Sequence, residues 1–128
     1  WQQPLAGALT QASGESTIHE TIYENRLGYT SDLKKMGATI QTQTACIGQP
    51  CQFVKLNVYH AARISGPTAL SGATVTIPDI RAGMAHVIGA LTATGDSIIR
   101  QVEILDRGYE RLDEKLRSLG AQIIRVDT

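Results

Sequence analysis

The stretch ALTATGDSIIRQVEILDR, residues 90–107, decides the fold because an earlier part of the chain repeats it as ALTQASGESTIHETIYENR, residues 8–26. Each copy runs from Ala-Leu-Thr through a small polar turn with a glycine into an alternating stretch, and ends in Asn-Arg or Asp-Arg. The segments that follow match as well, LKKMGATI (33–40) and LRSLGAQI (116–123). One structural unit therefore occurs twice in this chain.

The two copies cover about residues 4–43 and 79–128, and a variable insert separates them at about residues 44–66. The first helix of the second copy is expected to be buried on nearly every side, because apolar residues recur at helical spacing and small residues lie between them. The recurring residues are Met84, Val87, Ile88 and Leu91. The stretch PLAGALTQA, residues 4–12, has the same character and predicts the equivalent helix.

A strand and an amphipathic helix follow the buried helix. Alternation at Ile98, Val102 and Ile104 predicts a half-buried strand. The amphipathic helix has one apolar stripe and otherwise charged residues, and Gly120 is placed to end it. Its stripe consists of Tyr109, Leu112, Leu116 and Leu119, which correspond to Tyr29, Leu33 and Met36 before Gly37 in the first copy. The stretch AQIIRV, residues 121–126, predicts a further strand.

Two more strands are predicted between the copies, one where Val54, Leu56 and Val58 alternate with polar residues and one around Val75 and Ile77. The predicted order is helix, strand, helix, strand, strand, strand, and then helix, strand, helix, strand. This order is typical of an α/β arrangement with one buried and one exposed helix in each unit.

Three arginines are predicted at the starts of helices. Arg107 follows Asp106, a predicted N-cap, and Asn25-Arg26 occupies the same place in the first copy. Asp79 is predicted to cap the buried helix, with Arg81 in its first turn. A cation at a helix N-terminus opposes the helix dipole and costs about 0.3 to 1 kcal/mol, so three of them require an explanation.

Two interpretations of the arginines remain open at this point. In the first, the helix starts share one crevice, and their N–H groups and guanidinium groups bind a small, highly charged anion. In the second, each arginine pairs with its own capping residue or with a nearby acid such as Glu24 or Glu103, at the protein surface.

Four segments carry a resemblance to a known family. ETIYENRLGYTSDLKKMGA (20–38), LSGATV (70–75), DIRAGMAHVIGAL (79–91) and LDRGYERLDEKLRSLGA (105–121) resemble the closing third of the UDP-N-acetylglucosamine 1-carboxyvinyltransferases, the MurA family. The resemblance implies part of an inside-out α/β barrel, the enolpyruvyl transferase fold, built from repeated βαβαββ units with buried helices under an outer sheet. Residues 1–128 would be the C-terminal portion of one such domain.

The resemblance also implies an activity and a site. The family moves the enolpyruvyl group of phosphoenolpyruvate to UDP-N-acetylglucosamine, in cytoplasmic peptidoglycan synthesis, and the resemblance implies no cofactor. By motif position, Arg26, Arg81 and Arg107 line the phosphoenolpyruvate crevice, and Asp79 lies close to the reacting centre. Ile22 and Tyr23 match positions that contact the sugar nucleotide.

The family's catalytic loop motif, G-G-C-x-I-G-x-R-P, has no equivalent in these 128 residues. ACIGQPC, residues 45–51, lacks the paired glycines and the arginine, so we assign Cys46 no catalytic role. We therefore expect the isolated chain to be inactive and to require the remainder of the enzyme or self-association. A non-catalytic binding module of the same fold and a shikimate-type enolpyruvyl transferase are the alternatives.

The composition also restricts the kinds of ligand and partner that we expect for this chain. Twelve Lys+Arg balance twelve Asp+Glu, which argues against nucleic acid as a ligand, and no apolar run is long enough to predict a membrane span. The C-x4-C spacing of Cys46 and Cys51 fits no common metal knuckle, so free thiols of a reducing compartment are expected. His19, His60 and His86 show no ligand spacing, and we expect structural or solvated roles and no metal.

Overall fold

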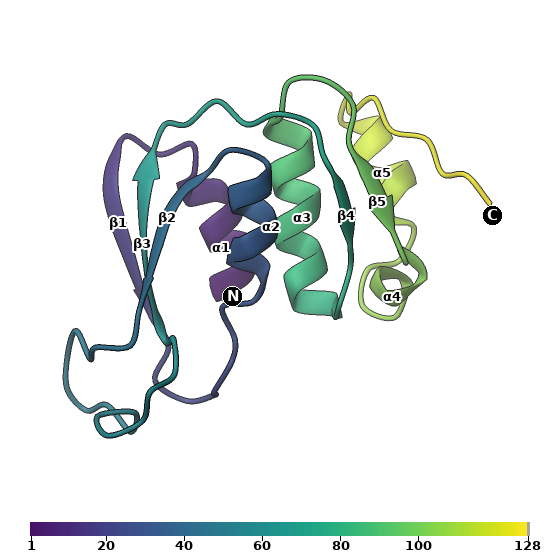
Figure 1. The fold of residues 1–128 in the computed structure, drawn as a ribbon. Helices are drawn as coiled ribbons and strands as arrows, with labels where there is room; N and C mark the ends of the chain where they lie inside the picture. Colours follow the sequence, from purple (N-terminus) through teal and green to yellow (C-terminus); the bar gives the residue numbers. More distant parts are fainter. Residues whose placement is uncertain (128) are drawn as a thin grey trace.

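The computed structural model describes residues 1–127 (Figure 1). Its elements, in chain order, are α1 (Gln2–Leu9), β1 (Gly14–His19), α2 (Tyr29–Lys35), β2 (Thr39–Gln43), β3 (Ala61–Gly66), β4 (Thr74–Thr76), α3 (Ile80–Thr92), β5 (Ile98–Arg100), α4 (Glu103–Asp106) and α5 (Leu112–Ser118). The mixed α/β class predicted from the sequence is confirmed.

Two small sheets lie on opposite sides of a layer of helices. Strands β1, β3 and β2 form an antiparallel sheet in that order, and β4 pairs with β5 in parallel. Figure 1 shows α1, α2 and α3 between the two sheets, with α4 and α5 beyond β5. The two helices predicted to be buried, α1 and α3, therefore lie in the inner layer, and α2, which was predicted to be the exposed helix of the first copy, lies there as well.

Small residues let the inner helices approach one another closely. A side chain at Gly7 of α1 would come within 3.1 Å of Ile88 on α3, and one at Gly89 would come within 3.0 Å of Leu33 on α2. The face of α3 that carries the small residues is accordingly buried, whereas Leu91 at its far end is 45% exposed. Close backbone approach is confirmed, but burial of α3 on nearly every side is not.

The core consists of two clusters. The larger one joins the inner helices to the three-stranded sheet and includes Leu33, Met36, Ile64 and Ala85. The smaller one centres on Ile77, Val87 and Leu105. Three residues of the predicted amphipathic stripe pack against it, namely Tyr109, Leu112 and Leu116, whereas Leu119 is 84% exposed. Gly120 lies just beyond α5 with a φ of +99°, as expected for a residue that ends a helix.

The strand predicted at Val54–Val58 is wrong. Those residues form a turn and an irregular segment, in which Val54 is 59% exposed while the neighbouring Phe53 is buried. The strand in this region is β3, which lies within the predicted insert and pairs with both β1 and β2. Alternation alone placed the strand too early, because β3 is buried on both faces along Ala61–Ala62 and its sequence does not alternate there.

Two further predictions in the second copy need correction. β5 ends at Arg100 rather than continuing to Ile104, since Gln101 takes a φ of 61° and the chain then turns into α4. Residues 121–126 are not a strand, and among residues 1–127 no strand pairs with them. Ile124 in this segment is 83% exposed.

His86 on α3 has no exposed side-chain surface, and burial lowers its pKa, an effect that Asp32 and Asp79 oppose only in part. Its Nε2 lies 3.1 Å from Asp32 Oδ2, but the contact does not have hydrogen-bond geometry. The folded chain therefore holds this imidazole neutral, whereas the unfolded chain protonates it near the ordinary pKa of about 6.5.

We expect the free energy of unfolding to fall as the pH is lowered through about 6.5, because the unfolded state then binds a proton that the folded state takes up only at lower pH. The loss is at most about 1.4 kcal/mol per pH unit. Urea unfolding at pH 7.5 and 5.5 measures it, and His86→Gln should flatten the profile. An equally steep profile in the variant would assign the pH dependence to other groups.

Gly72 provides a second test of the packing. A Cβ at this position would collide with the backbone carbonyl of Asp96, where Gly72 N donates to Thr94 O at 2.9 Å. We expect Gly72→Ala to destabilise the protein by about 1 to 3 kcal/mol, the usual cost of overpacking. Gly28→Ala is the matched control, since nothing lies within 4 Å of its Cβ position. Equal midpoints of chemical unfolding for the two variants would contradict this account.

Candidate functional site

The segments that carry the predicted site residues lie along one edge of the molecule, the lower edge in Figure 1. The segment from Glu20 to Gly28, the start of α3 and the whole of α4 are found there. The topology requires part of this arrangement, because β4 and β5 are parallel and α3 and α4 follow their carboxyl ends directly.

Asp79 is the N-cap of α3, as predicted. Its Oδ1 accepts hydrogen bonds from Arg81 N at 2.9 Å and Ala82 N at 3.0 Å. Both bonds use the same oxygen, and among the described residues no donor is hydrogen-bonded to Oδ2. The carboxylate is thereby held in place at the helix start with one oxygen available to a ligand.

Arg107 does not stand at the start of a helix, so that prediction is wrong. Helix α4 ends at Asp106 and Arg107 is its C-cap, while α5 begins only at Leu112, after Arg111 in the left-handed conformation. Asp106 binds Arg125 through two hydrogen bonds of 3.0 and 2.5 Å, and these bonds lower the pKa of its carboxyl group. The electrostatic cost argued for Arg107 therefore does not arise.

Arg26 also lies outside a helix. Helix α2 begins at Tyr29 with Gly28 as its N-cap, and Asn25 turns the chain with a φ of 55°. The guanidinium carbon of Arg26 lies 4.6 Å from the centroid of the Tyr23 ring, a cation–π contact. Two of the predicted substrate-binding residues are thus neighbours in space.

Packing brings the three arginine-bearing segments to the same edge. A Cβ at Gly108 would lie 3.0 Å from Ile80, so the residues next to Arg107 and Arg81 touch. Leu27, which follows Arg26, belongs to the same core cluster as Ala82 on α3. Within residues 1–127, the salt bridges involve other cations than these three arginines. The interpretation that each arginine pairs with a local acid is therefore not supported.

Glu20 fixes the segment that carries Ile22 and Tyr23, a role that the sequence did not reveal. Its Oε1 accepts from Ile22 N at 2.8 Å and from Tyr23 N at 3.1 Å, and its other oxygen accepts from the side chain of Gln2. The side chains of Ile22 and Tyr23 remain 66% and 57% exposed. Glutamate is not a characteristic turn residue, so the pattern of residue types gave no signal.

A shallow depression of about 330 Å³ lies beside this segment, at the start of α2. Its lining residues are Asn25, Leu27, Gly28, Thr30, Ser31, Lys34, Thr42 and Tyr59. Leu27 and Thr30 are buried, and the other lining residues are at least partly exposed. The depression adds one cation, Lys34, to the surroundings of Arg26.

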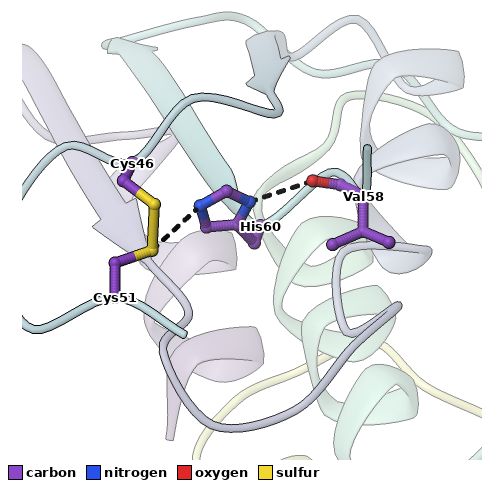
Figure 2. The surroundings of a disulfide bond; sticks show 4 residues. All are labelled: Cys46, Cys51, Val58 and His60. Carbon is purple, nitrogen blue, oxygen red and sulfur yellow. Dashed lines mark hydrogen bonds between the residues drawn. A yellow bond between two sulfur atoms is a disulfide. The ribbon is translucent and has the colours of Figure 1, made fainter. Parts of the chain in front are cut away.

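Cys46 and Cys51 are joined as a disulfide in this structure, which corrects the prediction of free thiols (Figure 2). The loop between them turns back so that their Cα atoms lie 6.2 Å apart, within the range that a disulfide spans. Sequence reasoning could not foresee this separation, because it depends on how the loop folds over the end of the sheet.

The family described as EPSP synthase (3-phosphoshikimate 1-carboxyvinyltransferase) matches residues 2–116. The chain belongs to the EPSP synthase family. Its arrangement is similar to the crystal structure of the enolpyruvyl transferase NikO from Streptomyces tendae, with a TM-score of 0.74 and 29% identity over 97% of this chain and 26% of that one. The enolpyruvyl transferase fold predicted from the sequence is confirmed.

Curated relatives of this family member confirm the more specific resemblance. Proteins named UDP-N-acetylglucosamine 1-carboxyvinyltransferase from Protochlamydia amoebophila, Chlamydia pneumoniae and Clostridium botulinum are 46%, 50% and 42% identical to it, over 99%, 96% and 98% of the chain. The chain spans only 28%, 27% and 26% of their respective lengths. No helix among the described residues is long and apolar enough to cross a membrane.

Proposed function

We propose that this chain is the C-terminal, substrate-binding portion of an enzyme that transfers the enolpyruvyl group of phosphoenolpyruvate to the 3-hydroxyl of UDP-N-acetylglucosamine in cytoplasmic peptidoglycan synthesis. The observation that carries the proposal is the 46% to 50% identity, over nearly the whole chain, to relatives named for this transfer. Since the chain spans about 28% of the first of these relatives, the activity belongs to the larger enzyme.

The charges of phosphoenolpyruvate support a role for the three arginines in binding this substrate. Phosphoenolpyruvate carries a carboxylate and a phosphate, and addition and elimination at its double bond pass through a tetrahedral intermediate that keeps both charges. Fixed guanidinium groups stabilise such charge where it develops. The segments that carry Arg26, Arg81 and Arg107 lie along one edge (Figure 1), and none of these arginines forms an ion pair with another described residue, which leaves them available to these anions.

Ile22, Tyr23 and Asp79 complete the proposed site. The exposure of Ile22 and Tyr23 on a segment held by Glu20 suits contact with a large ligand such as the sugar nucleotide. The carboxylate of Asp79 is held by two helix N–H groups through one oxygen, so the other oxygen can accept a proton or a hydrogen bond at the reacting centre.

Exposed apolar residues on the inner helices support the expectation of a further partner. Leu5 on α1 is 52% exposed and Leu91 on α3 is 45% exposed, although both lie on helices of the inner layer. The remainder of the enzyme, or a second copy of the chain, would cover them.

Two alternatives remain, each with one observation in its favour. The family description names the shikimate enzyme, which favours 3-phosphoshikimate as the acceptor. The long variable insert at about residues 44–66 favours a binding module without activity. Phosphate release by the intact enzyme that contains this chain, with phosphoenolpyruvate and either UDP-N-acetylglucosamine or 3-phosphoshikimate, distinguishes them. We expect turnover with the first acceptor only and none by the isolated chain.

Arg107→Ala in the intact enzyme should weaken phosphoenolpyruvate binding by about 1.5 to 3 kcal/mol, the range for hydrogen bonds to charged groups. Calorimetry measures the binding. Arg63→Ala is the matched control, because Arg63 is a half-exposed arginine of β3 that pairs with Glu15. Both variants should keep their stability within about 1 kcal/mol. Unchanged affinity in a folded Arg107→Ala protein would remove Arg107 from the proposed site.

A further inference from the structure

Four potential metal ligands meet at the end of the three-stranded sheet. The ligand atoms of His19, Cys46, Cys51 and His60 all lie within 4.8 Å of one another. Figure 2 shows three of them, with the ring of His60 between the two cysteines and the carbonyl group of Val58. Two sulfur atoms and two imidazoles form the donor set of structural zinc sites.

The sheet fixes where the two histidines stand. His19 is the last residue of β1, and His60 directly precedes β3. Glu20 N donates to His60 O at 2.7 Å, and His60 N donates to Gln43 O at 3.0 Å, so backbone hydrogen bonds join all three strands at this end. The loop with both cysteines leaves β2 at the same place. Rigid strands hold ligands more accurately than loops do.

The side chain of His60 is oriented as that of a metal-coordinating histidine would be. This side chain is fully buried, its Nδ1 lies 2.9 Å from Val58 O, and its Nε2 lies 3.5 Å from Cys51 Sγ (Figure 2). The carbonyl oxygen places the proton on Nδ1, which leaves the lone pair of Nε2 directed at the sulfur. Metal-bound histidines are oriented in the same way, by a carbonyl or carboxylate on the second ring nitrogen.

His19 gives a second, independent indication that a metal ion binds at this cluster. Its Nε2 is buried and has no hydrogen-bond partner among the described residues, and its ring centroid lies 5.3 Å from that of His60. A buried polar atom without a partner costs free energy, typically about 1 to 3 kcal/mol. A metal ion bound between the two rings and the sulfur atoms would give this nitrogen a partner.

We propose that the reduced protein binds one Zn²⁺ through His19, Cys46, Cys51 and His60. A thiol or phosphine reductant first opens the disulfide. With a thiol, two reductant molecules are oxidised to a disulfide and each cysteine gains one hydrogen. With a phosphine, one water molecule supplies both hydrogens and the oxygen of the resulting phosphine oxide. Zn²⁺ then displaces the two thiol protons, forming two Zn–S and two Zn–N bonds. Two thiolates balance the charge of the ion, and sulfur with imidazole favours zinc over magnesium or calcium.

Four protein ligands leave no open coordination position, so the site is structural. It would fasten the loop of residues 44–60 to the end of the sheet. The same loop reaches the proposed substrate segment, since Gln52 Nε2 donates to Ile22 O at 2.5 Å. The zinc proposal rests on the cluster alone and does not depend on the proposed enzymatic function.

The experiment uses the intact protein that contains this chain, reduced with a phosphine under nitrogen and dialysed against Zn²⁺. Elemental analysis should give one more Zn²⁺ per chain in the reduced wild type than in Cys51→Ser. A competition titration should show that Cys51→Ser and His19→Ala bind Zn²⁺ more than about 100-fold more weakly, beyond the usual loss for an outer-shell partner. Lys55→Ala, an exposed change in the same loop, is the control and should bind as the wild type does.

Substitution with Co²⁺ tests the wild type without any variant that could misfold. Tetrahedral Co²⁺ with thiolate ligands gives visible d–d bands and near-ultraviolet charge transfer, which should appear on reduction and be absent from the disulfide form. Absence of these bands from the reduced protein overturns the proposal. It is also overturned if the cysteine and histidine variants keep the wild-type Zn²⁺ affinity, or if the oxidised protein binds Zn²⁺ equally well.

Discussion

Close packing of α3 against α1 and α2 is the constraint on which the other features depend. Glycine at positions 7 and 89 lets Ile88 and Leu33 approach the neighbouring helix backbone to about 3 Å from where a Cβ would stand. A larger side chain at either position would push the helices apart. Because the two sheets lie on opposite sides of this helix layer, the packing of the helices also holds the sheets in place relative to one another (Figure 1).

The edge with the arginines follows from this packing. The parallel β4–β5 pair, connected through α3, brings Asp79 and Arg81 to the same edge as α4. The contact between Gly108 and Ile80 then places Arg107 beside the start of α3, and Leu27 anchors the segment of Arg26 in the larger core cluster. Side-chain packing brings the segments that carry the three arginines to this edge, and of the three only Arg81 stands in the first turn of a helix.

Features that depend on local spacing and helix capping were predicted well from the sequence, and turns and non-local strand pairing were predicted poorly. The helices α1 and α3, Gly37 and Gly120 as helix ends, and Asp79 as a cap were predicted correctly because spacing and cap chemistry are local. The helix starts predicted at Arg26 and Arg107 were wrong. Asn25 and Arg111 have positive φ values, so the chain turns there and the helices begin later, and the sequence pattern did not indicate these turns. β3 was missed because its pairing with β1 and β2 is non-local.

Non-local strand pairing is also the reason why the cluster of cysteines and histidines was not predicted from the sequence. Cys46 and Cys51 are five positions apart in a loop, but His19 belongs to β1 and His60 directly precedes β3, so no spacing along the chain connects them. The antiparallel register pairs both His19 and Gln43 with Ala61 and thereby gathers the ends of three strands. A one-residue slip of β1 would turn His19 to the opposite face of the sheet and dissolve the cluster. Strand register, which local patterns do not encode, therefore determines whether these four side chains form a site.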